Sequence, residues 1–189
     1  MARAGRVDAL VAGAGIGWAG PFVTMPPEEI DRVLTVNLTS TLRLVRLLLP
    51  PMVARGTGRL VLIGSMADWV GVGDEAVYSA SKGALLTFAD SLRRELAGTR
   101  VRVSVVSPGA VDTPFFARRG TPTIAAPRPV SAERVARGCG RRSYGAGRTF
   151  WCRGGWRFRR GCTGRRLGCS GPWPTVPTRT AVTEAGARR

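Results

Sequence analysis

Apolar residues in the first part of the chain form short continuous runs that alternate with longer periodic segments. The runs at 7–12, 59–65 and 101–106 are bounded by glycine, proline or charged residues, and they predict buried strands. Between them, the segments 27–52 and 78–96 repeat apolar residues at helical spacing and predict amphipathic helices. Continuous apolar strands separated by helices are typical of an α/β fold with a parallel sheet covered on both faces.

The first predicted helix has well-marked ends and one unusual residue inside. Pro27 suits its first turn, and Gly56 is expected to end it. Pro50 and Pro51 are expected to kink or loosen its last turn. Asn37 lies mid-helix, where asparagine is a poor helix former, and it can mark a kink that frees backbone groups for water or a side chain. Another helix is predicted to start near Ser131.

Three loop segments follow the predicted strands, at 12–17, 65–68 and 107–113. Ligands of parallel α/β sheets bind beyond the carboxyl ends of the strands, so these are the candidate binding segments. Gly15–Gly20 matches the dinucleotide pattern G-x-G-x-x-G, but three prolines separate it from the next helix. The favoured interpretation of that glycine pattern is therefore a plain strand-end loop.

Composition divides the chain in two. The 189 residues carry 29 basic and 12 acidic side chains, a net charge of +17, and no histidine, which excludes a histidine triad, metal site or pH switch. Residues 1–137 hold 17 basic and 11 acidic side chains, whereas 138–189 hold 12 arginines, one acid and all four cysteines. A segment so charged and so poor in aliphatic residues does not bury a core readily. We therefore predict one domain over 1–137 and a disordered Arg/Gly-rich tail over 138–189.

The tail has three interpretations. Its arginine, glycine, cysteine and tryptophan vocabulary favours out-of-frame translation of GC-rich DNA. Arginines with interleaved aromatic residues could instead bind single-stranded nucleic acid, but no repeated unit is present and nucleic acid is not an expected partner. A zinc site is the third, and the cysteines lack a C-x-x-C pair, so no metal site is expected. They are Cys139, Cys152, Cys162 and Cys169.

Membrane and export signals are not expected either. The most apolar run, 42–53, is crossed by Arg43, Arg46 and two prolines, so it is too short and too charged to span a bilayer. Asp8 and several glycines interrupt the stretch that would have to serve as a signal peptide. The sequence therefore predicts a cytoplasmic protein.

Candidate chemistry centres on Tyr78 and Lys82, which lie one turn apart on one face of a predicted helix. A phenol has a pKa of about 10, and a neighbouring cation favours its phenolate form. Lys82 is the only lysine of the chain, and arginine could not easily replace it because it keeps its proton. The pattern alone also fits a solvated pair. Ser65, thirteen residues before Tyr78, could donate a hydrogen bond to a substrate carbonyl, and Pro108–Gly109 could bring backbone close to a ligand or form a simple turn.

Together, Asn37, Ser65, Tyr78 and Lys82 resemble the Asn-Ser-Tyr-Lys tetrad of the short-chain dehydrogenases/reductases. The segment Ser-Pro-Gly-Ala-Val-Asp-Thr-Pro at 107–114 also resembles that family, and its spacing from the tetrad fits. Ala-Gly-Ala-Gly at residues 12–15 stands where the family has Asn-Asn-Ala-Gly, so both asparagines are replaced.

The resemblance implies a partial Rossmann-like, doubly wound parallel sheet, with strands corresponding to the family's fourth to sixth. It implies hydride transfer between NAD or NADP, with NADP slightly preferred, and a small carbonyl or alcohol substrate. Tyr78 would exchange the proton, Lys82 would lower the pKa of Tyr78 and bind the nicotinamide ribose, and Ser65 would polarise the substrate oxygen. Asn37 would hold a water of the proton relay. The implied cofactor contacts are Ala12, Gly13, Ala14, Gly15, Tyr78, Lys82, Pro108, Gly109, Val111 and Thr113.

The resemblance also has gaps. Family members begin with a strand-turn-helix unit that carries T-G-x-x-x-G-x-G, and this sequence starts just before what resembles their fourth strand. We therefore expect the N-terminal cofactor half to be missing and the edge of strand 7–12 to be bare, which invites pairing with another chain. A full-length form is expected to be a homo-oligomer, whereas this truncated chain is not expected to turn over. The alternatives are a non-enzymatic remnant or interaction fragment, or nucleic-acid binding through the tail.

Overall fold

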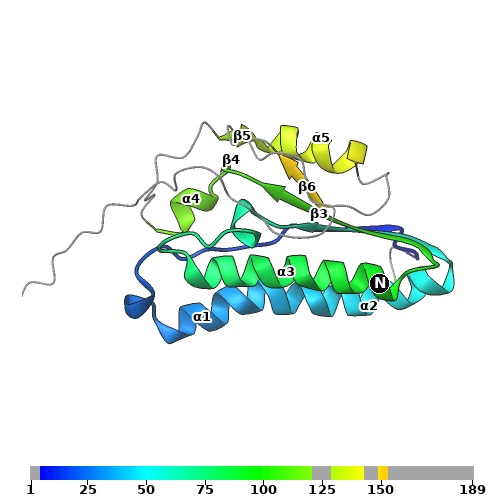
Figure 1. Cartoon of the computed structure of the whole chain (residues 1–189), viewed down its shortest axis with the longest axis horizontal. Helices are drawn as coiled ribbons and strands as arrows, with labels where there is room; N and C mark the ends of the chain where they lie inside the picture. The colour runs from blue at the N-terminus through cyan, green and yellow to red at the C-terminus, as the bar shows by residue number, and fades with distance from the viewer. Residues whose placement is uncertain (1–4, 121–128, 143–148, 153–189) are drawn as a thin grey trace, which may run out of the picture. The chain divides into compact units, whose positions relative to one another are not determined.

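Four strands form the main parallel sheet in the computed structural model, which describes residues 5–120, 129–142 and 149–152 (Figure 1). Their order across the sheet is β1-β2-β3-β6, and each adjacent pair is parallel. The strands are β1 (Ala9–Ala12), β2 (Thr57–Ile63), β3 (Arg100–Pro108) and β6 (Thr149–Cys152). β2 and β3 are the continuous valine and leucine runs, and they lie in the middle of the sheet. The predicted α/β fold with a parallel sheet is confirmed.

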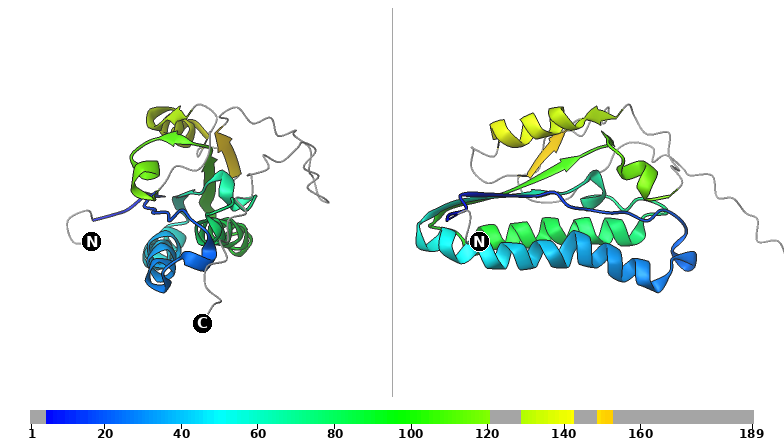
Figure 2. Two further views of the ribbon diagram at one scale, coloured as in Figure 1. Left: turned by 90° about the vertical axis from the view of Figure 1, so that its left-hand side faces the viewer. Right: turned by 180° about the vertical axis from the view of Figure 1, so that it is seen from behind.

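One face of the sheet is covered by the two long helical segments (Figure 2). These consist of α1 (Pro27–Leu34), the π-helical turn η2 (Thr35–Thr39), α2 (Ser40–Ala54) and α3 (Ala76–Glu95). Their inward side chains meet alternate residues of β2 and β3 in the main core. That core includes Val45, Leu48, Met52, Leu60, Leu62, Ala89, Leu92, Val103 and Val105, all buried. Each fully buried Val, Leu or Met contributes about 1.5–3 kcal/mol, so this face supplies most of the apolar stabilisation.

The opposite face carries a smaller core under α5 (Ala132–Arg142). Val61 and Val106 point to this side, since side chains alternate along a strand, and they pack with Val130 and Val135. A short parallel pair, β4 (Val111–Asp112) with β5 (Val130–Ser131), leads the chain to α5. The prediction of a sheet covered on both faces is therefore confirmed, with unequal layers.

The long helix contains the interruption expected at Asn37. It takes the form of a π-helical turn between α1 and α2, and Asn37 is fully buried there. At the other end, α2 continues through Pro50 and Pro51, and Gly56 follows with a φ of +69°. The amide of Gly56 donates to the carbonyl of Val53, so Gly56 ends the helix as predicted.

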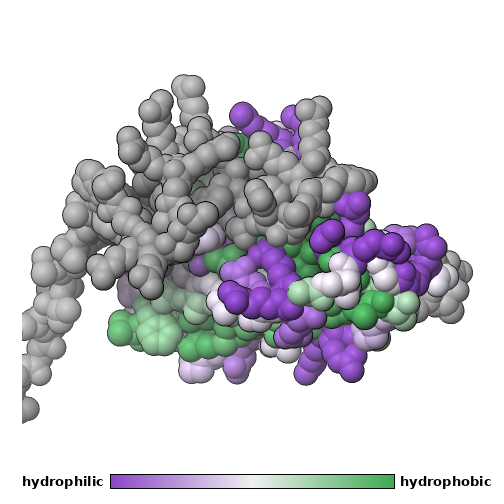
Figure 3. All heavy atoms as spheres, turned by 45° about the vertical axis from the view of Figure 1, so that its right-hand side comes forward, coloured by the Kyte–Doolittle hydropathy of each residue, from purple (hydrophilic) through white to green (hydrophobic). Residues whose placement is uncertain are grey.

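By length and composition alone, the helical segment 27–54 is apolar enough to cross a membrane. A core helix passes the same test, and the inward face of this segment packs against β2, β3 and α3. Its outward face carries exposed apolar side chains such as Leu44 and Leu47, and Figure 3 shows apolar surface among charged groups over the helical layer. The absence of a membrane span stays a prediction.

The elements continue past the change in composition predicted as a domain boundary. α5 runs across 137 to Arg142, and β6 pairs with β3 beyond it. A parallel ladder is made by backbone groups, which a glycine- and arginine-rich segment also has. Most of 138–189 lies outside the described residues, so the tail's disorder, its possible frame shift and the division into domains stay predictions.

β1 lies at one edge of the described sheet, and the bareness of that edge stays a prediction. Its Val11 is 60% exposed. In the part of the chain that the structure describes, no group of three or more His, Cys, Asp or Glu is placed to hold a metal ion.

Candidate active site

Three of the four predicted catalytic side chains come together beyond the carboxyl end of β2. β2 ends at Ile63, and Ser65 then caps the short helix η3 (Met66–Asp68) by accepting the amide of Ala67 at 3.2 Å. Tyr78 and Lys82 lie in the first turns of α3. The Ser65 hydroxyl lies close enough to Tyr78 to act on the pKa of the phenol, and Lys82 Nζ lies 5.8 Å from the centroid of the Tyr78 ring.

Lys82 is buried and bonded to the last residue of β2. Its side chain is 4% exposed, and Nζ donates to the carbonyl oxygen of Ile63 at 2.9 Å. Burial lowers the pKa of Lys82 to about 8, while the nearby Asp68 carboxylate acts in the opposite direction. Because this pKa is close to neutral pH, the Lys82 ammonium can give up and regain its proton there.

The pKa of Tyr78 lies above its ordinary value, and the role of Lys82 in lowering it stays a prediction. Burial raises the pKa of Tyr78 to about 12, and the hydrogen bond with Ser65 only partly opposes this. The charge of Glu75 raises it further, and Arg119 lowers it. Desolvation of the phenolate thus dominates the shift, and the phenol keeps its proton at neutral pH.

Asn37 acts as a clamp in the structure. Its Oδ1 accepts the amide of Ile16 at 2.8 Å, and its Nδ2 donates to the carbonyl of Ile16 at 2.9 Å and to Ser81 Oγ at 3.0 Å. Ser81 in turn donates to the carbonyl of Tyr78 at 2.7 Å. Both amide hydrogens of Asn37 are used, so its side chain ties the loop after β1 to α3. Its predicted role in holding a water stays a prediction.

The loop after β1, predicted to contact a cofactor, passes directly beside this cluster. A Cβ added at Gly15 would lie 3.4 Å from Lys82 Nζ and 3.5 Å from Asn37 Oδ1. Glycine at 15 therefore lets bare backbone run past the lysine. The other loop residues predicted as contacts are Ala12, which is half-buried, and Gly13 and Ala14, which are exposed.

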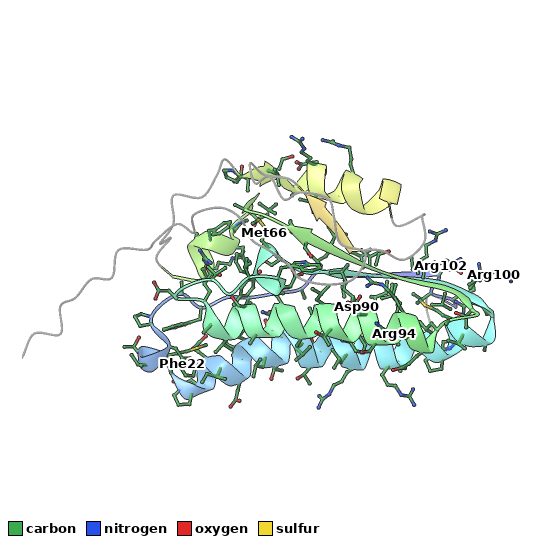
Figure 4. All side chains as sticks on the ribbon, in the orientation of Figure 1. Phe22, Met66, Asp90, Arg94, Arg100 and Arg102 are labelled. Carbon is green, nitrogen blue, oxygen red and sulfur yellow. The ribbon has the colours of Figure 1, made fainter. Side chains whose placement is uncertain are left out.

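The second predicted cofactor segment follows β3 at the same edge of the sheet. Pro108 is the buried last residue of β3, and a Cβ added at Gly109 would lie 3.2 Å from Met66 Sδ. Figure 4 shows Met66 on η3, between the sheet and the helix α4 (Phe115–Arg118). Val111 is paired with Val130 in the small sheet, and Thr113 is exposed just before α4.

Sequence reasoning missed a buried carboxylate in this cluster. Asp68 Oδ2 accepts the hydroxyl of Ser107 at 2.7 Å and the amide of Ser65 at 3.2 Å. Asp68 is 9% exposed, and burial raises its pKa. The local signal was present, because Ser65 and Asp68 have the spacing of a helix-capping box at the end of a strand. The link to Ser107, 39 residues away, has no local signal.

Sequence reasoning also missed a buried ion pair near Tyr78. Arg119, just after α4, forms a buried ion pair with Glu75, the residue before α3. The ring of Phe115 lies 5.4 Å from that of Tyr78, centroid to centroid. A Cβ added at Gly17 would lie 3.0 Å from the Phe115 ring. The segment after β4 is thus fastened over the cluster by one ion pair and ring contacts.

Comparison with known proteins agrees with this geometry. The chain matches the family described as short chain dehydrogenase over residues 1–123. It belongs to the short-chain dehydrogenase family.

The chain is similar in sequence to several curated reductases. It is 46% identical over 107 residues to a ketoacyl reductase, HetN, of Nostoc, covering 57% of this chain and 37% of that protein. It is 38% identical over 112 residues to the 3-oxoacyl-[acyl-carrier-protein] reductase FabG of Escherichia coli, covering 59% and 46%. The chain therefore spans less than half the length of these curated relatives.

A solved structure shares the fold. A short-chain dehydrogenase from Sphingobium yanoikuyae, in complex with NADPH, superposes with a TM-score of 0.71 at 27% identity. The match covers 79% of this chain and 58% of that one. The Rossmann-like fold expected from the resemblance is confirmed.

Proposed function

We propose that the protein is an NAD(P)-dependent oxidoreductase that reduces the carbonyl group of a small molecule, or oxidises the corresponding alcohol. The observation that carries the proposal is the grouping of Ser65, Tyr78 and the buried Lys82 beyond the end of β2, with Lys82 Nζ 5.8 Å from the centroid of the phenol ring. Family membership and the relatives named as reductases support it. Substrate identity and the direction of the reaction in the cell belong to the same proposal.

The chain's own residues supply the proton chemistry. A bound nicotinamide would supply the hydride that reduces the carbonyl carbon. The Tyr78 phenol, protonated at neutral pH because its pKa is about 12, would give its proton to the carbonyl oxygen. The Ser65 hydroxyl, whose oxygen accepts the amide of Ala67, would donate a hydrogen bond to the same oxygen. The Lys82 ammonium would stabilise the phenolate left on Tyr78 until a proton returns.

The described residues fit the nicotinamide end of such a cofactor. Lys82 has three donor hydrogens, one of which goes to Ile63, and the loop at Gly15 presents backbone beside it. Lys82 and Tyr78 would hold the ribose, and the segments at 12–15 and 108–113 would line the site. The slight preference for NADP stays a proposal, and competition between NADPH and NADH for binding would test it.

The protein is also proposed to form a homo-oligomer and to lie in the cytoplasm. Leu44 and Leu47 are exposed one turn apart on α2, at 39% and 60%, and support a homo-oligomer formed through this face. Sedimentation equilibrium would test this, with Leu47→Glu expected to weaken association. A cytoplasmic location, predicted from the sequence, would be tested by cell fractionation.

The direct test combines binding with turnover. NADPH should bind saturably, and its oxidation with a panel of 3-oxoacyl thioesters and small ketones should be followed at 340 nm. Tyr78→Phe should lower turnover at least about 100-fold, because it removes the proton donor. Tyr144→Phe, at the other tyrosine of the chain, is the matched control and should leave turnover unchanged. Saturable turnover that survives Tyr78→Phe would refute the proposed mechanism.

One observation favours a second candidate, a fragment that acts by pairing with another chain. β1 lies at the edge of the described sheet, and Val11 is 60% exposed. An exposed apolar edge strand offers unpaired backbone groups to a partner strand. If the chain binds no NADPH but self-associates, and Val11→Lys abolishes the association, this second function would replace the first.

A further inference from the structure

A buried carboxylate joins two segments of the candidate site that lie far apart in the sequence. Asp68 Oδ2 receives hydrogen bonds from the amide of Ser65, after β2, and from the hydroxyl of Ser107, near the end of β3. Ser107 is fully buried, and its bond of 2.7 Å has the length of a charge-assisted hydrogen bond. The Ser65 turn is thereby fixed to the neighbouring strand.

The surroundings leave this carboxylate little freedom. A Cβ at Gly64 would overlap Asp68 Oδ2 and would lie 3.1 Å from Ser107 Oγ. Residue 64 must therefore be glycine while Asp68 holds this position, because a backbone-bound Cβ cannot move out of the way. The capping box of η3 also fixes Asp68 through the backbone of Ser65.

The second oxygen of Asp68 is the one that has no hydrogen-bond donor within the described residues. Oδ1 is buried and unpaired, so its charge is compensated only through space. Lys82 is the cation nearby: its Nζ donates to the carbonyl of Ile63, and the next residue, Gly64, lies against Asp68 Oδ2. Each of the two charges acts on the pKa of the other group. Tyr78, the titratable group next to Lys82, is also influenced by Glu75 and Arg119.

We propose that Asp68 is a positioning residue of the active site, which holds the Ser65 turn against β3 through the Ser65 amide and the Ser107 hydroxyl and places a negative charge beside Lys82. The role of Ser65 and Lys82 in the reaction rests on the proposed function, whereas the coupling between Asp68 and Lys82 does not. Asp68 touches Ser65 and Ser107 and acts on the reaction through other side chains.

The single lysine makes the test direct. Growth with ε-¹³C-lysine places one side-chain label in the chain, at Lys82, and its NMR signal can be titrated in the full protein. Asp68→Asn keeps an oxygen that can accept from Ser65 and Ser107 but removes the charge. We expect the pKa of Lys82 to fall by about one pH unit, the lower end of the range for a neighbouring opposite charge.

The matched control is Asp90→Asn, which removes the same charge from the surface of α3. Asp90 pairs with Arg93 and is 58% exposed, and Figure 4 shows it well away from Met66 on η3. It should leave the titration of Lys82 unchanged. An equal effect of the two variants, or no effect of Asp68→Asn in a folded protein, would overturn the proposal.

A second measurement needs no variant and covers the case in which Asp68→Asn does not fold. In the unaltered protein, the Lys82 signal should show a second, smaller inflection where Asp68 titrates, above the ordinary aspartate pKa. A single inflection would overturn the coupling. If turnover is found, its alkaline limit in Asp68→Asn should move to lower pH with Lys82. Failure to bind NADPH would contradict the proposed function, whereas the Lys82 titration alone decides the coupling.

Discussion

Asp68 and Glu75 are two buried carboxylates on either side of Tyr78, and they are neutralised in different ways. Glu75 is 7% exposed and lies directly against the guanidinium of Arg119, itself 7% exposed. Asp68 is as buried but takes only a hydroxyl and an amide as partners, with a cation acting on it from further away. The Glu75 carboxylate, paired directly with Arg119, joins the segment after β4 to α3. The Asp68 carboxylate, which has no ion pair, acts instead on the pKa of Lys82.

The two carboxylates nevertheless share one electrostatic property. Burial raises the pKa of both above the ordinary values, and partners that lower it compensate only in part. A carboxyl group with a raised pKa in the folded state stabilises the protein below its unfolded pKa and loses that contribution as the pH rises through the folded pKa. Neither group therefore explains a loss of stability in mild acid.

The largest effect is expected from breaking the Glu75 ion pair at its cation. Arg119→Met leaves Glu75 buried without its partner, and it should lower the free energy of unfolding by about 3–5 kcal/mol at pH 8. The loss should be smaller at pH 5, since the unpaired carboxyl takes up a proton more readily. Urea unfolding followed by circular dichroism measures both.

The double variant Arg119→Met/Glu75→Gln is the control for that prediction, because it removes both charges. It should recover part of the loss. A single variant that costs less than about 1 kcal/mol would show that the pair behaves like a surface salt bridge.

A smaller loss is expected on the Asp68 side. Ser107→Ala removes one of the two hydrogen-bond donors to Asp68 Oδ2, the other being the amide of Ser65, and a hydrogen bond to a charged group is worth about 1.5–3 kcal/mol. Urea unfolding should show a decrease in this range. Ser40→Ala, which removes an exposed hydroxyl bonded to the carbonyl of Val36, should change stability by less than about 0.5 kcal/mol. Equal losses would mean that the buried bond has no special weight.

The smallest effect concerns the phenol between the two groups. Glu75→Gln and Asp68→Asn should each lower the pKa of Tyr78, because each removes a negative charge that disfavours phenolate. The decrease in the pKa of Tyr78 should be larger for Glu75→Gln, which also leaves Arg119 unpaired. In both variants it should be less than about one pH unit. Absorbance at 295 nm in a Tyr144→Phe background follows Tyr78 alone, with circular dichroism as a check on folding. A rise in either variant would contradict this reading of the charges.

Much of the fold could be predicted from local pattern. Continuous apolar runs gave β2 and β3 within two residues at each end, and an asparagine inside a helix marked the π-helical turn. Ser65, Tyr78 and Lys82 could be found because their spacing is fixed by one strand end and one helix face. Their roles came from the resemblance to a family.

The missed part of the site consists of contacts between distant segments. Asp68 and Ser107 are 39 residues apart, and Glu75 and Arg119 are 44 apart. Short polar residues at strand ends and an arginine in an arginine-rich chain carry no periodic signal. The sign of the Tyr78 pKa shift was also out of reach, because it depends on how deeply the folded chain buries the phenol.

The π-helical turn at Thr35–Thr39 makes the number of residues in this helix part of the site. A π turn accommodates one residue more than an α turn, and each residue of an α-helix turns the chain by about 100°. Deleting one residue here would let α1 and α2 merge into a regular helix and would rotate one of them against the sheet by about that angle. The amide of Asn37 would then swing away from Ile16 and release the loop beside Lys82. A deletion in this turn would thus change the surroundings of Lys82 only by rotating part of the helix, with every side chain of the site still present.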